Sequence, residues 1–252
     1  MVVLRSALFN LCFVVLTALG SLIGTVIGPF APRRIVALAR LWARLNLGAL
    51  RLLCGIRVTV SGLQHLPPGG AALIAPQHQS AFDTLVWLTL LPDCCYVLKR
   101  ELLRVPLFGR LTRIGGMILL DRSGGAAALR HLRRETLRAV SEGRQIVIFP
   151  EGTRVEFGTR ARLHPGVAAM QAASGLPIIP ARTDSGRRWG RRAFRKLPGT
   201  IHIDLVPPIP AGLDRATVMA RLESAFSRPA EGVENSVGTA ASGFVSDRKG
   251  RE

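Results

Sequence analysis

The chain is short of acidic residues, of lysine and of tyrosine. Only 16 acidic residues accompany 34 basic ones, so the net charge is +18, and Lys99, Lys196 and Lys249 are the only basic residues that are not arginine. This imbalance predicts an anionic partner, and composition leaves open whether it is nucleic acid, anionic lipid or a phosphorylated substrate. Arginine suits phosphate because its planar guanidinium donates two hydrogen bonds at once. A single tyrosine in a chain that is 48% hydrophobic favours a membrane over nucleic acid, since few rings are available for base stacking.

Cysteine is also scarce, and its spacing excludes the usual metal and redox motifs. The sequence has no CxxC pair and no cluster of cysteine and histidine at metal-ligand spacing. We therefore expect no metal, and free thiols that are buried or face lipid in a reducing compartment. The four residues concerned are Cys12, Cys54, Cys94 and Cys95.

The N-terminal segment carries no charge between residues 8 and 30. As a helix it would be roughly 34 Å long, enough to cross the hydrocarbon core of a bilayer. Several polar residues and glycines dilute it, so a shallow or re-entrant helix remains an alternative. A cleaved signal peptide is disfavoured, because the apolar run is long and the exit at residues 29–32, Pro-Phe-Ala-Pro, is no small-residue cleavage site.

Residues 31–60 contain six arginines and no acidic residue. At ~100° per residue, Arg33, Arg40, Arg44 and Arg51 fall within about 40° of one another. This pattern predicts a helix that lies in the lipid head-group layer, with a core helix that has one solvated face as the alternative. The arginine excess after the apolar segment, against Arg5 alone before it, places the following domain in the cytoplasm, at the plasma (inner) membrane. The broad surface opposite the arginines carries Leu38, Leu41, Trp42, Leu45, Leu52 and Leu53, with Leu47 at the edge of the stripe.

The remainder of the chain alternates short apolar runs with helical stretches, which predicts an α/β fold with a mainly parallel sheet flanked by helices. We divide the chain into an N-terminal membrane segment (1–56), a catalytic domain (57–228) and a disordered tail (229–252), whose composition lacks periodicity. The expected strands are 57–60, 71–75, 95–98, 117–120, 145–149, 178–181 and 201–206. The expected helices are 82–91, 125–141, 166–173 and 216–226.

The first candidate motif, QHQSAFD at residues 77–83, holds a histidine and a carboxylate five positions apart. A neutral imidazole at His78 can take a proton from an alcohol, and a carboxylate at Asp83 can fix its tautomer and stabilise the imidazolium. The alternative is a helix capping box formed by Ser80 and Asp83, beside an ordinary loop histidine.

The second candidate motif, FPEGTR at residues 149–154, follows an expected strand, as the first one does. Gly152 allows a turn that exposes backbone N–H groups, and Arg154 can bind a phosphate. A strand-ending turn with a surface ion pair is the alternative. Because sites gather at the carboxyl ends of parallel strands, we expect both motifs to line one crevice, with charge added by Lys99 and Arg100.

Two further segments carry a weaker signal. Residues 176–180, LPIIP, form an apolar strand bracketed by prolines, suited to the wall of an acyl-chain groove or simply to the core. Residues 187–196, RRWGRRAFRK, interleave six cations with Trp189 and Phe194. This composition suits a lipid interface, nucleic acid or a solvated basic loop.

The order of these blocks over residues 57–210 resembles the 1-acylglycerol-3-phosphate acyltransferase family, also known by its HxxxxD motif. That family carries N-H-x-S-x-x-D, then K-R-E-L with P-x-x-G, then F-P-E-G-T-R, then a V-P-I-V-P-like strand. The matching blocks here are 77–83, Lys99 to Leu102 with Pro106 and Gly109, 149–154, and 176–180. Two positions depart from the pattern. Gln77 replaces the usual asparagine, and residues 163–166 read LHPG where many members have a lysine-containing segment that contacts substrate.

The resemblance implies a membrane-bound enzyme of phospholipid biosynthesis that acylates the sn-2 hydroxyl of 1-acylglycerol 3-phosphate to phosphatidic acid. His78 would be the general base and Asp83 its orienting carboxylate, with acyl-CoA or acyl-carrier protein (acyl-ACP) as co-substrate and no cofactor. The residues implied for the acceptor phosphate and its pocket are Lys99, Arg100, Glu151, Gly152, Thr153 and Arg154.

Three alternatives to this activity stay open from the sequence. The acceptor can be another lysolipid, such as a lyso-ornithine lipid or lysophosphatidylglycerol. The chain can be a basic, membrane-tethered protein that binds nucleic acid through residues 187–196, or an inactive membrane scaffold. We expect anionic membrane lipids as partners and nucleic acid not to be one.

Overall fold

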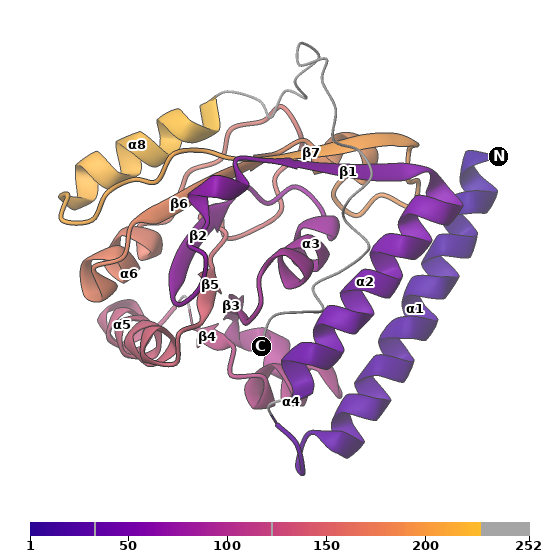
Figure 1. Ribbon diagram of the computed structural model, residues 1–252, viewed down its shortest axis with the longest axis horizontal. Helices are drawn as coiled ribbons and strands as arrows, with labels where there is room; N and C mark the ends of the chain where they lie inside the picture. The colour runs from indigo at the N-terminus through magenta and orange to yellow at the C-terminus, as the bar shows by residue number, and fades with distance from the viewer. Residues whose placement is uncertain (33, 122, 228–252) are drawn as a thin grey trace, which may run out of the picture.

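The computed structural model describes residues 1–32, 34–121 and 123–227, which form a seven-stranded sheet between two helical layers (Figure 1). The strand order is β1-β7-β6-β2-β5-β3-β4. Every neighbouring pair is parallel except β6 and β7, which run antiparallel. The strands are β1 (Ile56–Ser61), β2 (Ala72–Pro76), β3 (Cys94–Lys99), β4 (Ile118–Leu120), β5 (Gln145–Val147), β6 (Ile178–Thr183) and β7 (Gly199–Leu205).

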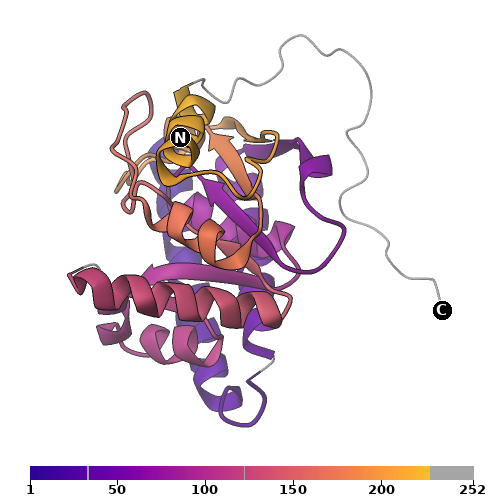
Figure 2. The same ribbon diagram turned by 90° about the vertical axis from the view of Figure 1, so that its left-hand side faces the viewer.

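One face of the sheet is covered by α5 (Gly125–Ser141), α6 (Gly166–Ser174) and α8 (Arg215–Ser227), which lie in front of it in Figure 2. The other face is covered by α3 (Phe82–Leu90), and α2 (Arg34–Cys54) packs on α3. The pleat explains the two cores: along β2, Leu73 and Ala75 face the first layer while Ala72 and Ile74 face the second.

The expected α/β class with a mainly parallel sheet is confirmed, and each expected strand and helix is present within two residues of its bounds. Four short elements were not expected from the sequence. They have too few residues for a periodic pattern to show. They are the 3-10 turns η1 (Leu63–His65) and η2 (Arg100–Arg104) and the helices α4 (Phe108–Ile114) and α7 (Ser185–Arg188).

The N-terminal segment forms an antiparallel helical hairpin of α1 (Val2–Ile27) and α2, joined to the catalytic core rather than separate from it (Figure 1). Trp42 on α2 donates a hydrogen bond from Nε1 to Thr17 Oγ1 on α1, at 3.2 Å. Phe9 of α1 and Leu50 of α2 belong to the same buried cluster as the sheet. The division at residue 56 stays a prediction, and one core runs across it.

The arginine-striped helix has one buried side and one exposed side, and its place in a lipid head-group layer stays a prediction. Ala43 and Leu50 are buried, as in a core helix, while Leu41, Leu45 and Leu52 are exposed beside Arg44 and Arg51. Helix α1 is also long and apolar enough to cross a bilayer, and most of its outer surface is exposed. The hairpin therefore exposes many apolar side chains, with arginines among them on α2. Residue 33 and the expected tail at 229–252 lie outside the described residues.

Candidate active site

The QHQSAFD motif lies at the carboxyl end of β2, as expected, in a loop that is tied to β6 and α7. The Gln77 N–H donates to Ala181 O at 2.9 Å, and Gln77 Oε1 accepts the Thr183 N–H at 3.1 Å. Gln79 is buried; its Nε2 donates to Thr183 O at 2.8 Å, and its Oε1 accepts the Gly186 N–H at 3.1 Å. The amide at position 77, where the family has asparagine, thus holds the loop through its side chain.

The side chains of His78 and Asp83 meet, as their spacing predicted. His78 Nδ1 lies 3.2 Å from Asp83 Oδ2, and the carboxylate is 2% exposed. The same oxygen accepts the N–H groups of Gln79 at 2.7 Å and Ser80 at 2.8 Å. Backbone donors of this kind stabilise the ionised carboxylate and fix its position. Because Nδ1 faces Asp83, the Nε2 atom of His78 is left to meet a substrate.

The capping role and the histidine contact are compatible. Asp83 lies in the first turn of α3 and accepts the Ser80 N–H, as the acid of a capping box does. Ser80 Oγ accepts the Phe82 N–H at 3.1 Å rather than that of Asp83, so the box is only half formed. One carboxylate therefore caps the N-terminus of α3 and orients the histidine.

The second motif supplies the other wall of the site. The Phe149 ring stacks on His78 with centroids 4.0 Å apart and an interplanar angle of 18°. The Val155 N–H donates to His78 O at 2.7 Å, and the His78 N–H donates to Glu151 Oε1 at 3.3 Å. Both motifs thus line one site, as their positions after two strands of a parallel sheet predicted, and β2 and β5 are neighbours in that sheet.

Glu151 is buried, and within the described residues its Oε2 has no hydrogen-bond partner. Burial raises the pKa of Glu151 to about 8, the charge of Asp83 adds to this, and the hydrogen bond from the His78 N–H acts in the opposite sense. The side chain is therefore mostly neutral at pH 7, which leaves Asp83 as the negative charge beside the histidine.

Arg154 is the cation of this site. It is half-buried, and no hydrogen bond to it is found among residues 1–32, 34–121 and 123–227. Burial lowers the pKa of its guanidinium, the charge of Asp83 raises it, and that of Arg191 lowers it. Gly152 turns the chain at φ +65°, and Thr153 is exposed. An unpaired guanidinium of this kind can bind an anion.

Lys99 and Arg100 lie farther from the histidine. They follow β3, which is separated from β2 by β5, so the strand spacing places them about 10 Å away across the sheet. Lys99 is exposed, and Arg100 lies 3.4 Å from Asp121 in a surface ion pair. The structure therefore brings His78, Asp83, Glu151 and Arg154 together and leaves these two cations at the periphery.

Sequence reasoning missed three contributors to the site. Gln79 and Phe149 stand inside the motifs, but a sequence does not show that one side chain ties the loop to α7 or that the other stacks on the histidine. Arg191, within electrostatic range of Arg154, was noted only as part of a basic run. Within the described ranges no group of three or more His, Cys, Asp or Glu side chains lies together as metal ligands would.

Comparisons with known proteins agree with the two motifs. The acyltransferase family matches residues 57–184. The 1-acyl-sn-glycerol-3-phosphate acyltransferase of Pseudomonas aeruginosa is 31% identical over 224 residues, which cover 87% of this chain and 86% of that protein. The 1-acyl-sn-glycerol-3-phosphate acyltransferase alpha of Mus musculus is 30% identical over 66% of this chain, which spans 59% of the mouse protein.

Among solved structures, the 1-acyl-sn-glycerophosphate acyltransferase of Thermotoga maritima shares the fold. The TM-score is 0.73, and the match covers 94% of this chain and 100% of that one at 17% identity. Family match, relatives and the two motifs at one edge of the sheet agree: the chain belongs to the 1-acyl-sn-glycerol-3-phosphate acyltransferase family and is an acyltransferase.

Proposed function

We propose that this enzyme transfers an acyl chain from acyl-CoA or acyl-ACP to the sn-2 hydroxyl of 1-acylglycerol 3-phosphate, giving phosphatidic acid. The observation that carries the proposal is the His78–Asp83 pair, in which Asp83 Oδ2 is fixed by two backbone N–H groups and leaves Nε2 of the histidine available. Relatives that are 1-acyl-sn-glycerol-3-phosphate acyltransferases support the acceptor.

The histidine acts as a general base. His78 Nε2 takes the proton of the acceptor hydroxyl while the hydroxyl oxygen attacks the thioester carbonyl carbon. As the carbon–sulfur bond breaks, the imidazolium returns that proton to the departing thiolate. Asp83 stabilises the imidazolium through Nδ1. The stacked Phe149 ring restricts the imidazole to one plane. No acyl-enzyme is formed, and the Ser80 hydroxyl is engaged with the Phe82 N–H.

The acceptor phosphate is bound by Arg154, whose guanidinium is half-buried and unpaired within the described chain. A charge-assisted, two-pronged contact with a phosphate is favoured in such a setting. A neutral Glu151 assists by placing no second negative charge near the phosphate. Gly152 and Thr153 shape the turn, and Lys99 and Arg100 attract the anionic lipid from the rim.

The site meets its lipid substrate through the α1–α2 hairpin, which holds the enzyme on the cytoplasmic face of the inner membrane. Helix α1 contacts the catalytic domain near both ends: Phe9 packs on Trp189 at 5.2 Å between ring centroids, and Gly24 approaches the Leu111 side chain. A helix held along the domain in this way favours an interfacial anchor over a perpendicular span.

Another lysolipid acceptor is supported by one observation. The LHPG segment at 163–166 stands where many family members carry a lysine, and it lies close to the site because the His164 N–H donates to Pro150 O at 2.8 Å. A site with one cation fewer at this point suits a head group with less negative charge.

The test is acyl transfer by purified full-length protein in detergent, with wild type beside His78→Ala. Both acyl donors are offered against 1-acylglycerol 3-phosphate, lyso-ornithine lipid and lysophosphatidylglycerol. We expect turnover with the phosphate monoester that the variant loses. Retained activity in His78→Ala excludes the proposed base, activity on another lysolipid alone changes the acceptor, and no activity on any acceptor supports a scaffold.

A further inference from the structure

A buried lysine fastens the basic loop formed by residues 187–197 to α1. Lys196 is 3% exposed, and its Nζ donates to Phe194 O at 2.9 Å, to Ala193 O at 3.3 Å and to Asn10 Oδ1 of α1. Its backbone N–H donates to Ser6 Oγ at 2.9 Å. No carboxylate pairs with Lys196 among the described residues, so carbonyl and amide oxygens hold the charge.

Aromatic rings complete this attachment. Lys196 Nζ lies 4.9 Å from the Trp189 ring centroid and 5.7 Å from that of Phe9, within the range of cation–π attraction. Trp189 also contacts Phe13 edge-on at 5.9 Å. The base of the loop is closed by the Leu197 N–H, which donates to Arg188 O at 2.8 Å. The loop is thus an ordered structure seated on α1.

The outer side of the same loop is exposed and carries both charge and apolar surface. Phe194 is 54% exposed and Leu197 is 43% exposed. Arg191, Arg192 and Arg195 are exposed, and within the described chain none of them has a hydrogen bond or ion pair. The sequence has no acidic residue between 184 and 204. Free guanidiniums around an exposed ring are suited to a head-group layer over an acyl layer.

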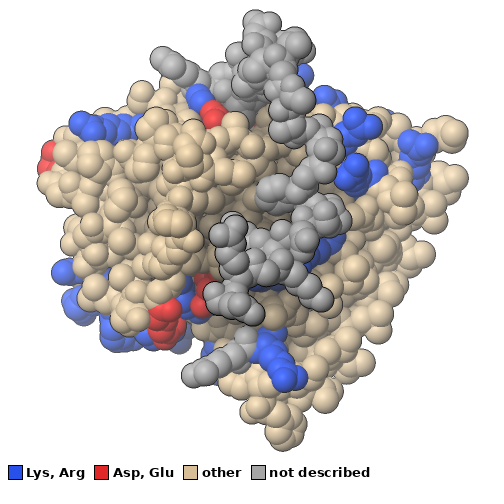
Figure 3. Space-filling view, in the orientation of Figure 1, with Lys and Arg blue, Asp and Glu red and all other residues tan. Residues whose placement is uncertain are grey.

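The loop continues the apolar surface of the hairpin. Asn10 Nδ2 of α1 donates to Phe194 O at 3.4 Å, which places the loop beside the exposed Leu8 and Leu11. Lys and Arg side chains gather where β7 approaches the N-terminal part of α1, in the upper right of Figure 3. The loop also borders the site. The N–H of Gly186, which directly precedes the loop, donates a hydrogen bond to Gln79 Oε1, and the charge of Arg191 lowers the pKa of Arg154.

We propose that residues 187–197 are a second membrane contact, in which Arg191, Arg192 and Arg195 bind anionic lipid head groups and Phe194 enters the acyl layer. Lys196 sets the height of this contact relative to α1. Head groups bound here would lie next to Arg154, at the entrance that an anionic lysolipid takes. This last role rests on the proposed function, whereas the membrane contact does not depend on it.

The experiment measures whether position 194 enters the bilayer. Full-length Phe194→Trp is bound to vesicles whose acyl chains carry bromine, which quenches tryptophan fluorescence. The wild type is measured in the same way, so that the signal of Trp42, Trp87 and Trp189 can be subtracted. We expect added quenching on phosphatidylglycerol-containing vesicles and less on phosphatidylcholine alone. In Phe194→Trp with R191Q, R192Q and R195Q, the equilibrium constant for contact of the loop with the anionic bilayer should fall about a hundredfold. The reason is that each arginine at an anionic surface contributes about 1 kcal/mol, or about fivefold.

Two matched controls use equivalent surface far from the loop. Leu129 on α5 is 45% exposed, a fraction similar to the 54% of Phe194. Leu129→Trp should show no added quenching. Arg130, Arg133 and Arg221 are exposed and unpaired within the described residues, and changing all three to Gln should leave quenching at position 194 unchanged. If the control variant lost as much quenching at position 194 as the loop variant, net charge alone would explain the effect and the proposal would be overturned.

Failure of this contact is distinguishable from failure of the enzymatic function, because quenching needs no turnover. Unquenched tryptophan at position 194 on anionic vesicles would overturn the proposal whether or not the protein acylates lysolipids. Salt-sensitive binding of a labelled RNA or DNA duplex, lost in the R191Q, R192Q and R195Q variant while quenching is absent, would assign the loop to nucleic acid instead.

Discussion

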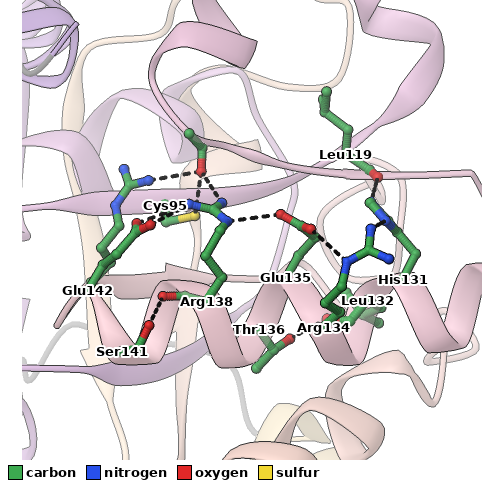
Figure 4. A network of polar contacts seen from close by, with 12 residues as sticks. Cys95, Leu119, His131, Leu132, Arg134, Glu135, Thr136, Arg138, Ser141 and Glu142 are labelled. Atoms are coloured by element: carbon green, nitrogen blue, oxygen red, sulfur yellow. Dashed lines mark hydrogen bonds and ion pairs between the residues drawn. The ribbon is translucent and has the colours of Figure 1, made fainter.

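Two arginine-rich regions of this chain have similar compositions and different surroundings. At the C-terminal end of α5 and in the turn after it, two arginines are neutralised within the fold: Arg138 binds Glu135 and Glu142, and the buried Arg144 binds Asp93. Figure 4 shows the chain of polar contacts along α5. In loop 187–197 the exposed arginines have no acidic neighbour in the sequence. The number of arginines alone does not separate a cation that stabilises the fold from one that is free to bind a ligand. The acidic groups and carbonyl oxygens around each guanidinium make that distinction.

The energetic meaning of the comparison follows from burial. Arg144 donates to the carbonyl oxygens of Gly116, Cys94 and Gly115 as well as to Asp93, so several buried groups depend on it. Removing one partner of a buried network leaves the others unsatisfied, which costs more than the network contributes. The exposed arginines leave nothing unsatisfied when they are removed, so their role must be sought outside the chain.

The largest effect on activity is expected at the His78–Asp83 pair of the proposed mechanism. Asp83→Asn keeps the shape of the side chain but removes the charge that stabilises the imidazolium, and we expect kcat to fall on the order of 10⁴-fold. Steady-state acyl transfer measures the loss, and circular dichroism checks the fold. A loss below tenfold would show that Asp83 serves mainly as the cap of α3.

The largest effect on stability is expected in the paired region. Arg144→Met keeps the volume of the buried stem but removes the donor to the half-exposed Asp93 and to the carbonyls of Cys94 and Gly115, while Gly116 O keeps Arg138 as a donor. We expect a cost of about 3 to 5 kcal/mol in unfolding free energy, because buried carbonyl groups are left unsatisfied. Denaturant unfolding in detergent measures it. Arg134→Gln, which breaks a surface pair with Glu135 and a hydrogen bond to His131, is the matched control and should change stability by less than about 1 kcal/mol. Equal losses of unfolding free energy in the two variants would show that the buried arginine network contributes no more to stability than a surface pair.

The acidic residues repeat the same contrast and predict a pH dependence. Burial acts to raise the pKa of Glu135, yet hydrogen bonds from Arg138 and Arg134 leave it lowered; Glu151 lacks such partners and its pKa rises to about 8. The folded state then holds a proton that the unfolded state releases above about pH 4.5. Stability from this proton is full below that pH and is lost as the pH rises to about 8.

Glu151→Gln should remove this dependence, because the amide is neutral in both states. At about 1.4 kcal/mol per pKa unit, the unfolding free energy of the wild type should fall by several kcal/mol between about pH 4.5 and about pH 8. The unfolding free energy of the variant should not change through this proton. Melting temperature against pH measures the difference, and Glu142→Gln on the exposed side of α5 serves as the control. A wild-type curve as flat as that of Glu151→Gln would mean that Glu151 is ionised at neutral pH.

The smallest effect of the set concerns the unpaired guanidinium at the site. Arg154→Ala should raise the KM for 1-acylglycerol 3-phosphate by about 10- to 100-fold, the value of a charge-assisted hydrogen bond at about 1.5 to 3 kcal/mol, and leave stability nearly unchanged. Kinetics with varied acceptor at fixed donor measure it. An unchanged acceptor KM would remove Arg154 from phosphate binding.

Much of the fold and the centre of the site could be predicted, because both have short-range signatures. Apolar runs between helical stretches marked every strand, and the five-residue gap from His78 to Asp83 is closed locally by the turn into α3. The reversal of β7 against β6 and the short helix α4 could not be predicted, since they depend on contacts far along the chain. The same is true of Phe149 on His78, which brings together residues 71 positions apart.

The sequence by itself determined the α/β class and the apolar N-terminal segment, and it singled out His78, Asp83 and Arg154 as candidates for the site, because periodicity and motif spacing are local properties. The tertiary structure alone decided that Arg144 is buried against Asp93, because that partner lies 51 residues away in the chain. It also decided that Lys196 is buried against α1, with Ser6 and Asn10 as partners 190 and 186 residues away. Burial and the satisfaction of polar groups arise only when the chain packs, and they assign each charge its role.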